Sequence, residues 1–166
     1  KVNLPYGICA ERLYDGIKLY VAKEKEYTEF LLKEIDIDRM MNKEIEISES
    51  EYIKFEECEN IQDVERMPET LYTKLMNYDI LKGNVSIRNR RPKDYMIIDG
   101  KGRKKKLKDM LIDMKIPKEE RDKLVLLTKG SEVLWIIGYR MSESCKINAD
   151  TKKTIKVKYK EMEKSK

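Results

Sequence analysis

Histidine is absent from the 166 residues of this chain, and its absence excludes several kinds of catalytic site. Without an imidazole the chain contains no Ser-His-Asp triad, no Cys-His pair, no histidine-ligated zinc and no imidazole general base. The three cysteines, Cys9, Cys58 and Cys145, lie far apart in the sequence and form no C-x-x-C pair, which argues against a thiolate zinc site. We therefore expect no metal site, and plain buried or half-buried thiols in a reducing cytosol.

Long hydrophobic runs are also missing. No stretch of about 18 apolar residues is present, so we expect no membrane-spanning helix and no membrane partner. No charged-then-apolar leader opens the chain, so no signal peptide is expected either, and we predict a cytoplasmic location. The sequence begins with Lys1, and a strand pattern follows almost at once, so we interpret the chain as a piece of a longer protein.

Charge is abundant and unevenly distributed. Asp, Glu, Lys and Arg make up 40 % of the residues, against about 25 % in an average globular protein. Residues 1–82 carry 12 Lys and Arg against 19 Asp and Glu, a net charge of −7, whereas residues 83–166 carry 24 against 12, a net charge of +12. We predict an acidic domain over residues 1–82, a basic domain over residues 83–160 and a frayed tail over residues 161–166. A polyanion is the natural partner of the basic domain.

The acidic half has mainly β patterning. Two apolar runs flank Asp15-Gly16, a dipeptide typical of tight hairpin turns, and predict strands over residues 8–14 and 17–21. Alternating apolar residues predict a second pair of strands, around residues 45–47 and 52–55, with a bend at residues 48–50. Residues 56–67 read as a loop, and residues 71–81 fit a strand or a helix equally well.

The basic half alternates between the two periodicities, which predicts an α+β fold with a mixed sheet. Strands are expected over residues 85–90, 95–98, 124–127, 133–137 and 154–159. Helices are expected over residues 104–115 and 118–124. In the first helix, Leu107, Met110, Leu111 and Met114 form an apolar stripe that would seat it on the sheet. Trp135 lies in a run that is apolar on both faces, so a core position is favoured over a base-stacking role.

Two clusters of cations are the clearest candidate functional feature. Residues 101–108 (KGRKKKLK) place six cations in eight positions, and residues 88–91 (RNRR) add three arginines nearby. A solvated surface would explain the lysines alone. The arginines, with planar guanidinium groups that match phosphate oxygens, favour polyanion binding. A helix-turn-helix around Ile116-Pro117 is disfavoured, because its second helix carries Glu119, Glu120 and Asp122, which would repel a DNA backbone.

Five motifs in the basic half together resemble the C-terminal region of bacterial tRNA(Ile)-lysidine synthetases. They are residues 87–94 (IRNRRPKD), 105–109 (KKLKD), 113–117 (DMKIP), 121–122 (RD) and 134–139 (LWIIGY). Their order and spacing match the family pattern over residues 85–140, and residues 1–80 resemble the more variable intermediate domain. Two residues depart from the pattern: Lys93 replaces a glycine and Val125 replaces a proline.

The resemblance implies a function that composition alone does not show. Enzymes of this family use ATP, with Mg²⁺, to adenylate the wobble cytidine of tRNA(Ile) with a CAU anticodon, and lysine then displaces AMP to form lysidine. Their S-G-G-x-D-S pyrophosphate loop is absent here, because the chain has no Gly-Gly pair. The resemblance therefore implies a tRNA-gripping fragment without catalytic residues or a cofactor of its own. Its partners would be tRNA(Ile) and the protein's own N-terminal catalytic domain, and whether it forms a homodimer stays open.

The family's C-terminal domain is similar to a module of phenylalanyl-tRNA synthetase β-subunits and is held to engage the tRNA body. Double-stranded RNA offers phosphates and 2′-hydroxyls, which suit positioned Arg and Lys side chains better than a recognition helix. The expected RNA contacts are Arg88, Arg90, Arg91, Arg103, Lys104, Lys105, Lys106, Lys108, Arg140 and Lys146. Four further residues of the pattern, Asp94, Asp113, Arg121 and Asp122, are expected to form caps and internal ion pairs. The alternative is a protein-interaction module that docks a partner through the acidic half.

Overall fold

The computed structural model describes residues 2–3, 8–13, 16–21, 33–58 and 70–161, and the chain divides into two compact units. Unit 1 is Lys1–Phe30 and unit 2 is Leu31–Lys166. No helix in the described part of the chain is long and apolar enough to cross a lipid bilayer.

Unit 1 contains a three-stranded antiparallel sheet in the order β1-β2-β3. Its strands are β1 (Val2–Asn3), β2 (Ile8–Leu13) and β3 (Gly16–Val21). The predicted hairpin is confirmed, because Leu13 pairs with Gly16 and Ile8 with Val21. Gly16 belongs to the strand, and the connecting residues 14–15 lie outside the described residues.

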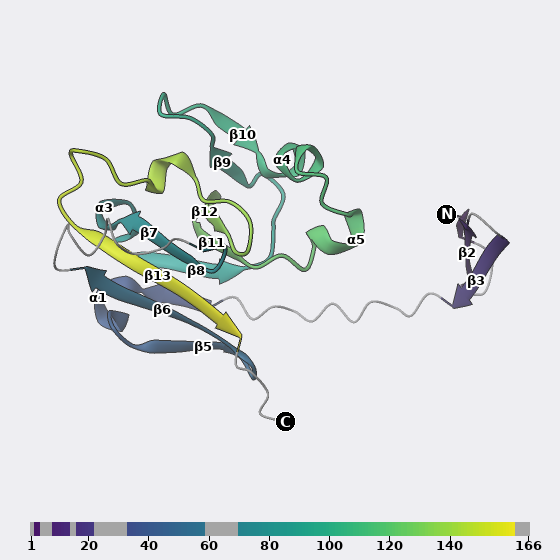
Figure 1. Ribbon diagram of the computed structural model, residues 1–166, viewed down its shortest axis with the longest axis horizontal. Helices are drawn as coiled ribbons and strands as arrows, with labels where there is room; N and C mark the ends of the chain where they lie inside the picture. The colour runs from purple at the N-terminus through teal and green to yellow at the C-terminus, as the bar shows by residue number, and fades with distance from the viewer. Residues whose placement is uncertain (1, 4–7, 14–15, 22–32, 59–69, 162–166) are drawn as a thin grey trace. The chain divides into compact units, whose positions relative to one another are not determined.

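The first sheet of unit 2 has four antiparallel strands in the order β5-β6-β13-β7. They are β5 (Glu44–Ser48), β6 (Glu51–Cys58), β7 (Thr73–Asn77) and β13 (Thr154–Glu161). Figure 1 shows β13, in yellow, running between β6 and β7. The predicted strand pair with its bend at residues 48–50 is confirmed. The ambiguous segment 71–81 contains both a strand, β7, and a helix, α3 (Tyr78–Leu81). The predicted loop over residues 56–67 begins inside β6, and residues 59–67 lie outside the described part.

The second sheet of unit 2 has six strands in the order β10-β9-β12-β11-β8-β4. All its pairings are antiparallel except that of β12 with β9. The strands are β4 (Lys33–Asp36), β8 (Asn84–Arg88), β9 (Tyr95–Ile97), β10 (Lys104–Lys106), β11 (Leu126–Lys129) and β12 (Glu132–Ile136). The remaining elements are α1 (Ile37–Met40), α4 (Leu107–Asp113), α5 (Lys118–Arg121) and the short 3₁₀ helix η2 (Glu143–Cys145). The predicted α+β class with a mixed sheet is thus confirmed.

Packing of α4 on the six-stranded sheet follows the predicted apolar stripe. Leu107, Met110 and Leu111 are buried in one cluster with side chains of β9, β11 and β12, and Met114 packs against it. The expected central strand is also present, since β12 lies between β9 and β11 and every residue from Val133 to Ile136 is buried. Trp135 is 0 % exposed, which confirms its core position.

The predicted helix over residues 104–115 is wrong at its start. Lys104, Lys105 and Lys106 form β10, because they pair with Ile97, Met96 and Tyr95 of β9 before α4 begins. The backbone hydrogen bonds of this hairpin override the helix propensity of the lysines. The second predicted helix, over residues 118–124, ends at Arg121.

The charge boundary near Gly83 does not coincide with the boundary between the compact units. Strand β4 of the acidic half pairs with β8, and β13 of the basic half pairs with both β6 and β7. These pairings join residues 31–82 of the acidic half to the basic half within unit 2. The division at Gly83 stays a prediction about charge and function.

Candidate nucleic-acid interface

A tight turn after β8 organises the first cation cluster. The Asp94 N–H donates to the Arg91 carbonyl (3.3 Å), which closes a four-residue turn with Pro92 second and Lys93 third. Lys93 has φ +74°, and a positive φ at the third position after a proline defines a type II turn. The Asp94 carboxylate also accepts a hydrogen bond from the Arg91 N–H (2.7 Å), which fixes the turn from inside.

Arg88, a predicted RNA contact, is buried instead. Its guanidinium makes two hydrogen bonds with the Asp94 carboxylate (2.8 and 2.9 Å), and both side chains are almost fully enclosed, at 4 % and 1 % exposed. The same two terminal nitrogens also donate to backbone carbonyls, Nη2 to Gly130 (2.8 Å) and Nη1 to Asn89 (2.9 Å). Arg88 therefore holds the turn to the sheet and is not accessible to a nucleic acid.

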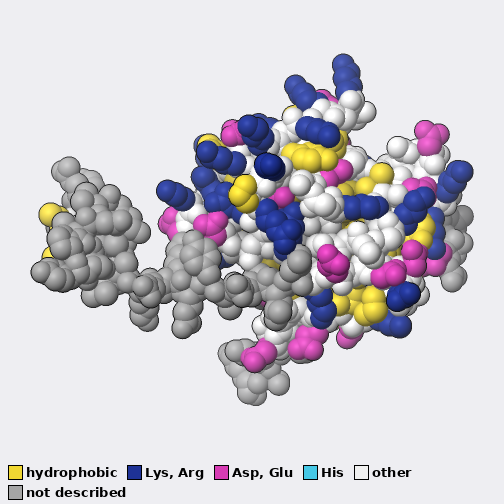
Figure 2. Space-filling view, turned by 180° about the vertical axis from the view of Figure 1, so that it is seen from behind, with side chains coloured by type: hydrophobic (Ala, Val, Ile, Leu, Met, Phe, Trp, Pro, Cys, Tyr) yellow, Lys and Arg dark blue, Asp and Glu magenta, His cyan; other side chains and the backbone are white. Residues whose placement is uncertain are grey.

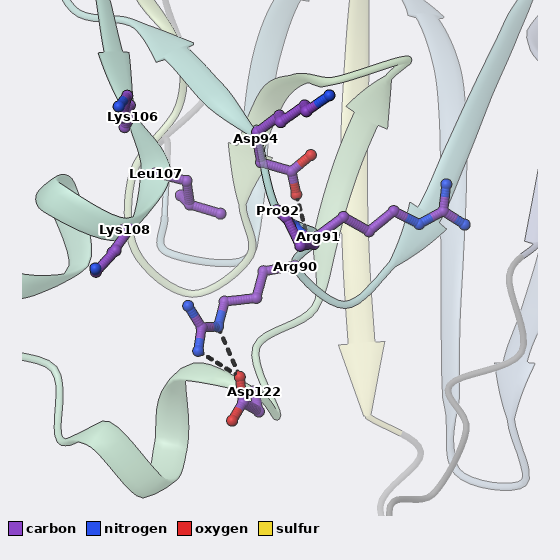
Figure 3. A pocket seen from close by; sticks show the side chains of 9 residues that line it. Arg90, Arg91, Pro92, Asp94, Lys106, Leu107, Lys108 and Asp122 are labelled. Carbon is purple, nitrogen blue, oxygen red and sulfur yellow. Dashed lines mark hydrogen bonds and ion pairs between the residues drawn. The ribbon is translucent and has the colours of Figure 1, made fainter.

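Beside this turn lies a pocket of about 500 Å³. It is lined by Arg90, Arg91, Pro92, Lys93, Asp94, Lys106, Leu107, Lys108 and Asp122. Figure 3 shows that the turn after β8 forms one side and the β10–α4 junction another. The fold thus brings together residues of the two predicted cation clusters.

Both carboxylates of the pocket are already engaged by arginines. Asp94 pairs with Arg88, and Asp122 accepts from the Arg90 Nε (2.7 Å) and lies 2.6 Å from its Nη2. These ion pairs neutralise the negative charge of both carboxylates. Within the described residues, the other four lysines and arginines of its lining have no carboxylate partner: Arg91, Lys93, Lys106 and Lys108.

Two further cations of the predicted lysine run are paired with neighbouring carboxylates. Arg103 lies 3.1 Å from Asp99 in the β9–β10 connection, and hydrogen bonds from the Arg103 and Lys101 backbone N–H groups help to hold the pKa of Asp99 below its usual value. Lys105 is half-buried and forms an ion pair with Asp113 of α4. These two side chains are less available for an incoming phosphate.

The other lysines of the run are exposed, because alternation along β10 places Lys104 and Lys106 on the face opposite Lys105. The Lys104 ammonium lies 4.5 Å from the centre of the Tyr95 ring, a cation–π contact. Lys106 and Lys108 extend from the two sides of the β10–α4 junction into solvent at the pocket.

Arg140 and Lys146 lie outside the pocket lining. Both face Glu143 of η2, at 3.8 and 2.7 Å, so one carboxylate offsets part of their charge. The Ser142 hydroxyl donates to the Ile97 carbonyl (3.3 Å) and connects this segment to β9. Arg140 and Lys146 thus form a second group of cations, whose charge Glu143 partly neutralises.

The four residues expected to be structural make internal bonds. Asp94, Asp113 and Asp122 pair with Arg88, Lys105 and Arg90 respectively. The Arg121 Nε donates to the Ile116 carbonyl (2.8 Å) and so ties α5 to the end of α4. The pocket residue that sequence reasoning missed is Lys93, although its position in an R-P-K-D turn was a usable signal.

No nucleophilic or metal chemistry is evident in the described part of the chain. Burial raises the pKa of the Cys145 thiol to about 12, so it stays protonated at neutral pH, and Cys58 is half-buried. No group of three or more Cys, Asp or Glu side chains among these residues could hold a metal ion. The chemistry of the described site is therefore that of unpaired cations, whose charge suits an anionic ligand.

Cationic and acidic side chains gather on different parts of the surface. Figure 2 shows Lys and Arg side chains gathered in the upper part of the view, whereas Asp and Glu are more frequent in the lower part. Open cationic surfaces next to a rigid sheet are suited to phosphate backbones. The fold and the site together define a class: an α+β domain that carries a cationic surface pocket.

Comparisons with known proteins agree with this class. A family model described as the TilS substrate C-terminal domain matches residues 85–158. The tRNA(Ile)-lysidine synthase of Caldanaerobacter subterraneus subsp. tengcongensis is 34% identical over 160 residues, which cover 96% of this chain and 33% of that protein. The tRNA(Ile)-lysidine synthase of Clostridium perfringens is 32% identical over 164 residues, which cover 96% of this chain and 35% of that protein. The chain thus carries the TilS substrate C-terminal domain over residues 85–158, and nearly its whole length is similar to tRNA(Ile)-lysidine synthases.

A solved structure shows the same fold. The crystal structure of a TilS C-terminal domain superposes with a TM-score of 0.60 at 22% identity, and the match covers 80% of this chain and 98% of that chain. The chain spans about a third of the length of the curated relatives that it matches.

Proposed function

We propose that this chain is the tRNA-binding C-terminal portion of an ATP-dependent ligase that joins lysine to the wobble cytidine of tRNA(Ile) to form lysidine. The pocket between the turn and the β10–α4 junction carries this proposal, because it concentrates cations whose local carboxylates are already occupied. Such a surface binds phosphates of an RNA stem through charge and position, without reading base edges.

In the full-length enzyme, ATP and Mg²⁺ would belong to an N-terminal catalytic domain. That domain and tRNA(Ile) would be the partners of this chain in the cytoplasm. The likeness to a module of phenylalanyl-tRNA synthetase β-subunits stays a prediction, and the question of a homodimer stays open. A protein-interaction module is not favoured by the similarity to tRNA(Ile)-lysidine synthases. A recognition helix is not supported either, because α5 spans only four residues.

The test is a salt titration of tRNA binding by the 166-residue chain, read by fluorescence anisotropy. If about 4–6 phosphates are contacted, the logarithm of the binding constant should fall with the logarithm of salt with a slope of about −3 to −5. A triple variant of the unpaired pocket cations, Arg91→Gln, Lys106→Gln and Lys108→Gln, should weaken binding by at least about tenfold and flatten the slope by about 2 to 3.

The matched control is the triple variant Lys43→Gln, Lys152→Gln and Lys160→Gln. These lysines are exposed beside or on the four-stranded sheet, outside the pocket lining, and the charge change is the same. The control should bind tRNA almost as the unmodified chain does. Equal losses from both triple variants would show that net charge alone drives binding, and the assigned site would be wrong.

A further inference from the structure

Lys93 has a backbone conformation that its residue type disfavours. Three non-glycine residues of the described chain have positive φ: Asn42 (63°), Lys93 (74°) and Lys115 (55°). Asparagine tolerates the left-handed region, whereas a lysine there brings its Cβ too close to the backbone. The two lysines therefore need an explanation.

Lys115 is explained by the end of a helix. It follows α4, its N–H donates to the Ile112 carbonyl (2.9 Å), and the next N–H, of Ile116, donates to Leu111 (3.1 Å). This pairing is that of a left-handed C-terminal cap, which a helix commonly requires. The Lys115 side chain is exposed and does not line the pocket.

Lys93, in contrast, does not lie at the end of a helix. The third position of a type II turn favours glycine, so the turn itself would be more stable without this side chain. Backbone strain of this kind concentrates at functional sites. The Lys93 side chain lines the cationic pocket and has no carboxylate partner among the described residues.

The two arginines of the turn differ from Lys93 in their surroundings. Figure 3 shows that Arg90 points toward Asp122, which holds it in an ion pair, and that the guanidinium of Arg91 extends away from Lys106 and Lys108. Lys93 also lines the pocket, and it has no carboxylate partner in the described part of the chain. Lys106 and Lys108 line the same pocket.

We propose that Lys93, together with Lys106 and Lys108, binds one phosphodiester of an RNA backbone in this pocket, and that the strained turn is the cost of placing that charge. This inference rests on the proposed function. It adds Lys93 as a contact residue and a phosphodiester as the ligand group. The Lys93 side chain would then strengthen RNA binding and at the same time destabilise the turn.

The experiment compares Lys93→Gly with Lys115→Gly in the 166-residue chain. Each variant removes one charge and one side chain at positive φ, so both should raise the midpoint of thermal unfolding. Only Lys93→Gly should weaken tRNA binding, by about 3- to 10-fold, with the salt slope reduced by about 1. A further variant, Lys93→Asn, keeps a residue that tolerates the turn and should lose the same affinity.

The outcomes separate this inference from the proposed function. If Lys93→Gly binds tRNA normally while the Arg91, Lys106 and Lys108 triple variant does not, the inference fails and the proposed function stands. If neither variant changes binding, both fail. An equal loss in Lys115→Gly, or a lower unfolding midpoint in Lys93→Gly, also overturns the inference.

A free phosphate could bind the same pocket, and a competition experiment distinguishes it from an RNA backbone. Sodium phosphate and sodium chloride at matched ionic strength should weaken tRNA binding equally. Specific displacement of tRNA by inorganic phosphate, lost in Lys93→Gly, would assign the pocket to free phosphate and overturn the phosphodiester assignment.

Discussion

Single residues of one type have different roles in this chain because their surroundings differ. Arg88 is enclosed by backbone carbonyls and Asp94, Arg90 is half-buried against Asp122, and Arg91 is exposed. The three lie within four positions of one basic motif. Charge in the sequence indicated a cationic region, but it did not distinguish the cations that build the turn from those that face solvent.

The Arg88–Asp94 pair leads to the first prediction. Arg88→Ala should lower the free energy of unfolding by about 3–5 kcal/mol, because it leaves a buried carboxylate without its partner. Urea denaturation measures this change. Arg103→Ala, which breaks the exposed pair with Asp99, is the control and should cost less than about 1 kcal/mol. If folded Arg88→Ala lost tRNA affinity with little loss of stability, Arg88 would be a contact residue after all.

Glu56 leads to the second prediction. It lies on the four-stranded sheet within 2.9–3.2 Å of the ammonium groups of Lys54, Lys156 and Lys158. Partial burial raises the pKa of Glu56, but the hydrogen bonds from these three lysines outweigh it and lower the pKa to about 2. Because the folded pKa lies below the ordinary value of 4.5, the carboxylate stabilises the fold above pH 4.5 and loses this effect as the pH falls toward 2.

Glu56→Gln should therefore lower the free energy of unfolding at pH 7 by up to about 3 kcal/mol. The difference from the unmodified chain should shrink between pH 4.5 and pH 2. Urea denaturation across this range tests it, with Glu46→Gln, an exposed residue of the neighbouring β5, as control. A difference that stays constant with pH would show that Glu56 is not the titrating group.

At the scale of elements, periodicity predicted well where burial decides the structure. The stripe of α4 and the doubly apolar run of β12 were correct because each pattern matches one face, or both faces, of a packed element. The start of α4 was not predictable in the same way. Lys104–Lys106 carry no apolar signal, and only their pairing with β9, a contact made in three dimensions, makes them a strand.

The central strand β12 leads to the third prediction. Trp135→Ala should lower the free energy of unfolding by about 3–5 kcal/mol, because a fully buried indole leaves a large cavity. Thermal or urea denaturation measures this loss. Tyr139→Ala, at an exposed position after the same strand, should cost less than about 1 kcal/mol. A near-neutral Trp135→Ala with impaired tRNA binding would mean that the indole stacks on bases.

At the scale of the whole molecule, charge and packing divide the chain differently. The acidic half contributes β4 to the six-stranded sheet that also carries the cationic pocket, so unit 2 combines residues of both halves. The net charge of a segment indicates whether a cationic or an anionic partner suits its surface. It says little about which strands pair, because pairing depends on backbone contacts between distant segments.

The fourth prediction concerns chemistry. Incubated with ATP, Mg²⁺, lysine and tRNA(Ile) with a CAU anticodon, this chain alone should release no AMP and form no lysidine. The chain has neither the Gly-Gly of a pyrophosphate loop nor a histidine. Thin-layer chromatography of labelled ATP measures the result against a boiled sample. AMP above that background would place adenylation chemistry within these residues.

The position of β13 between β6 and β7 has a consequence for how the protein is made. Thr154 of β13 pairs with Cys58 of β6, and the two residues are separated by most of the basic half. On a ribosome that adds about 5–20 residues per second, β6 would wait roughly 5–20 s for its partner strand. In the native sheet β6 does not pair directly with β7, so the edge of β6 that pairs with β13 has no native partner strand until β13 is made. Nascent-chain folding of this sheet is therefore a late event, and chains arrested before β13 should be early targets of chaperones and proteases.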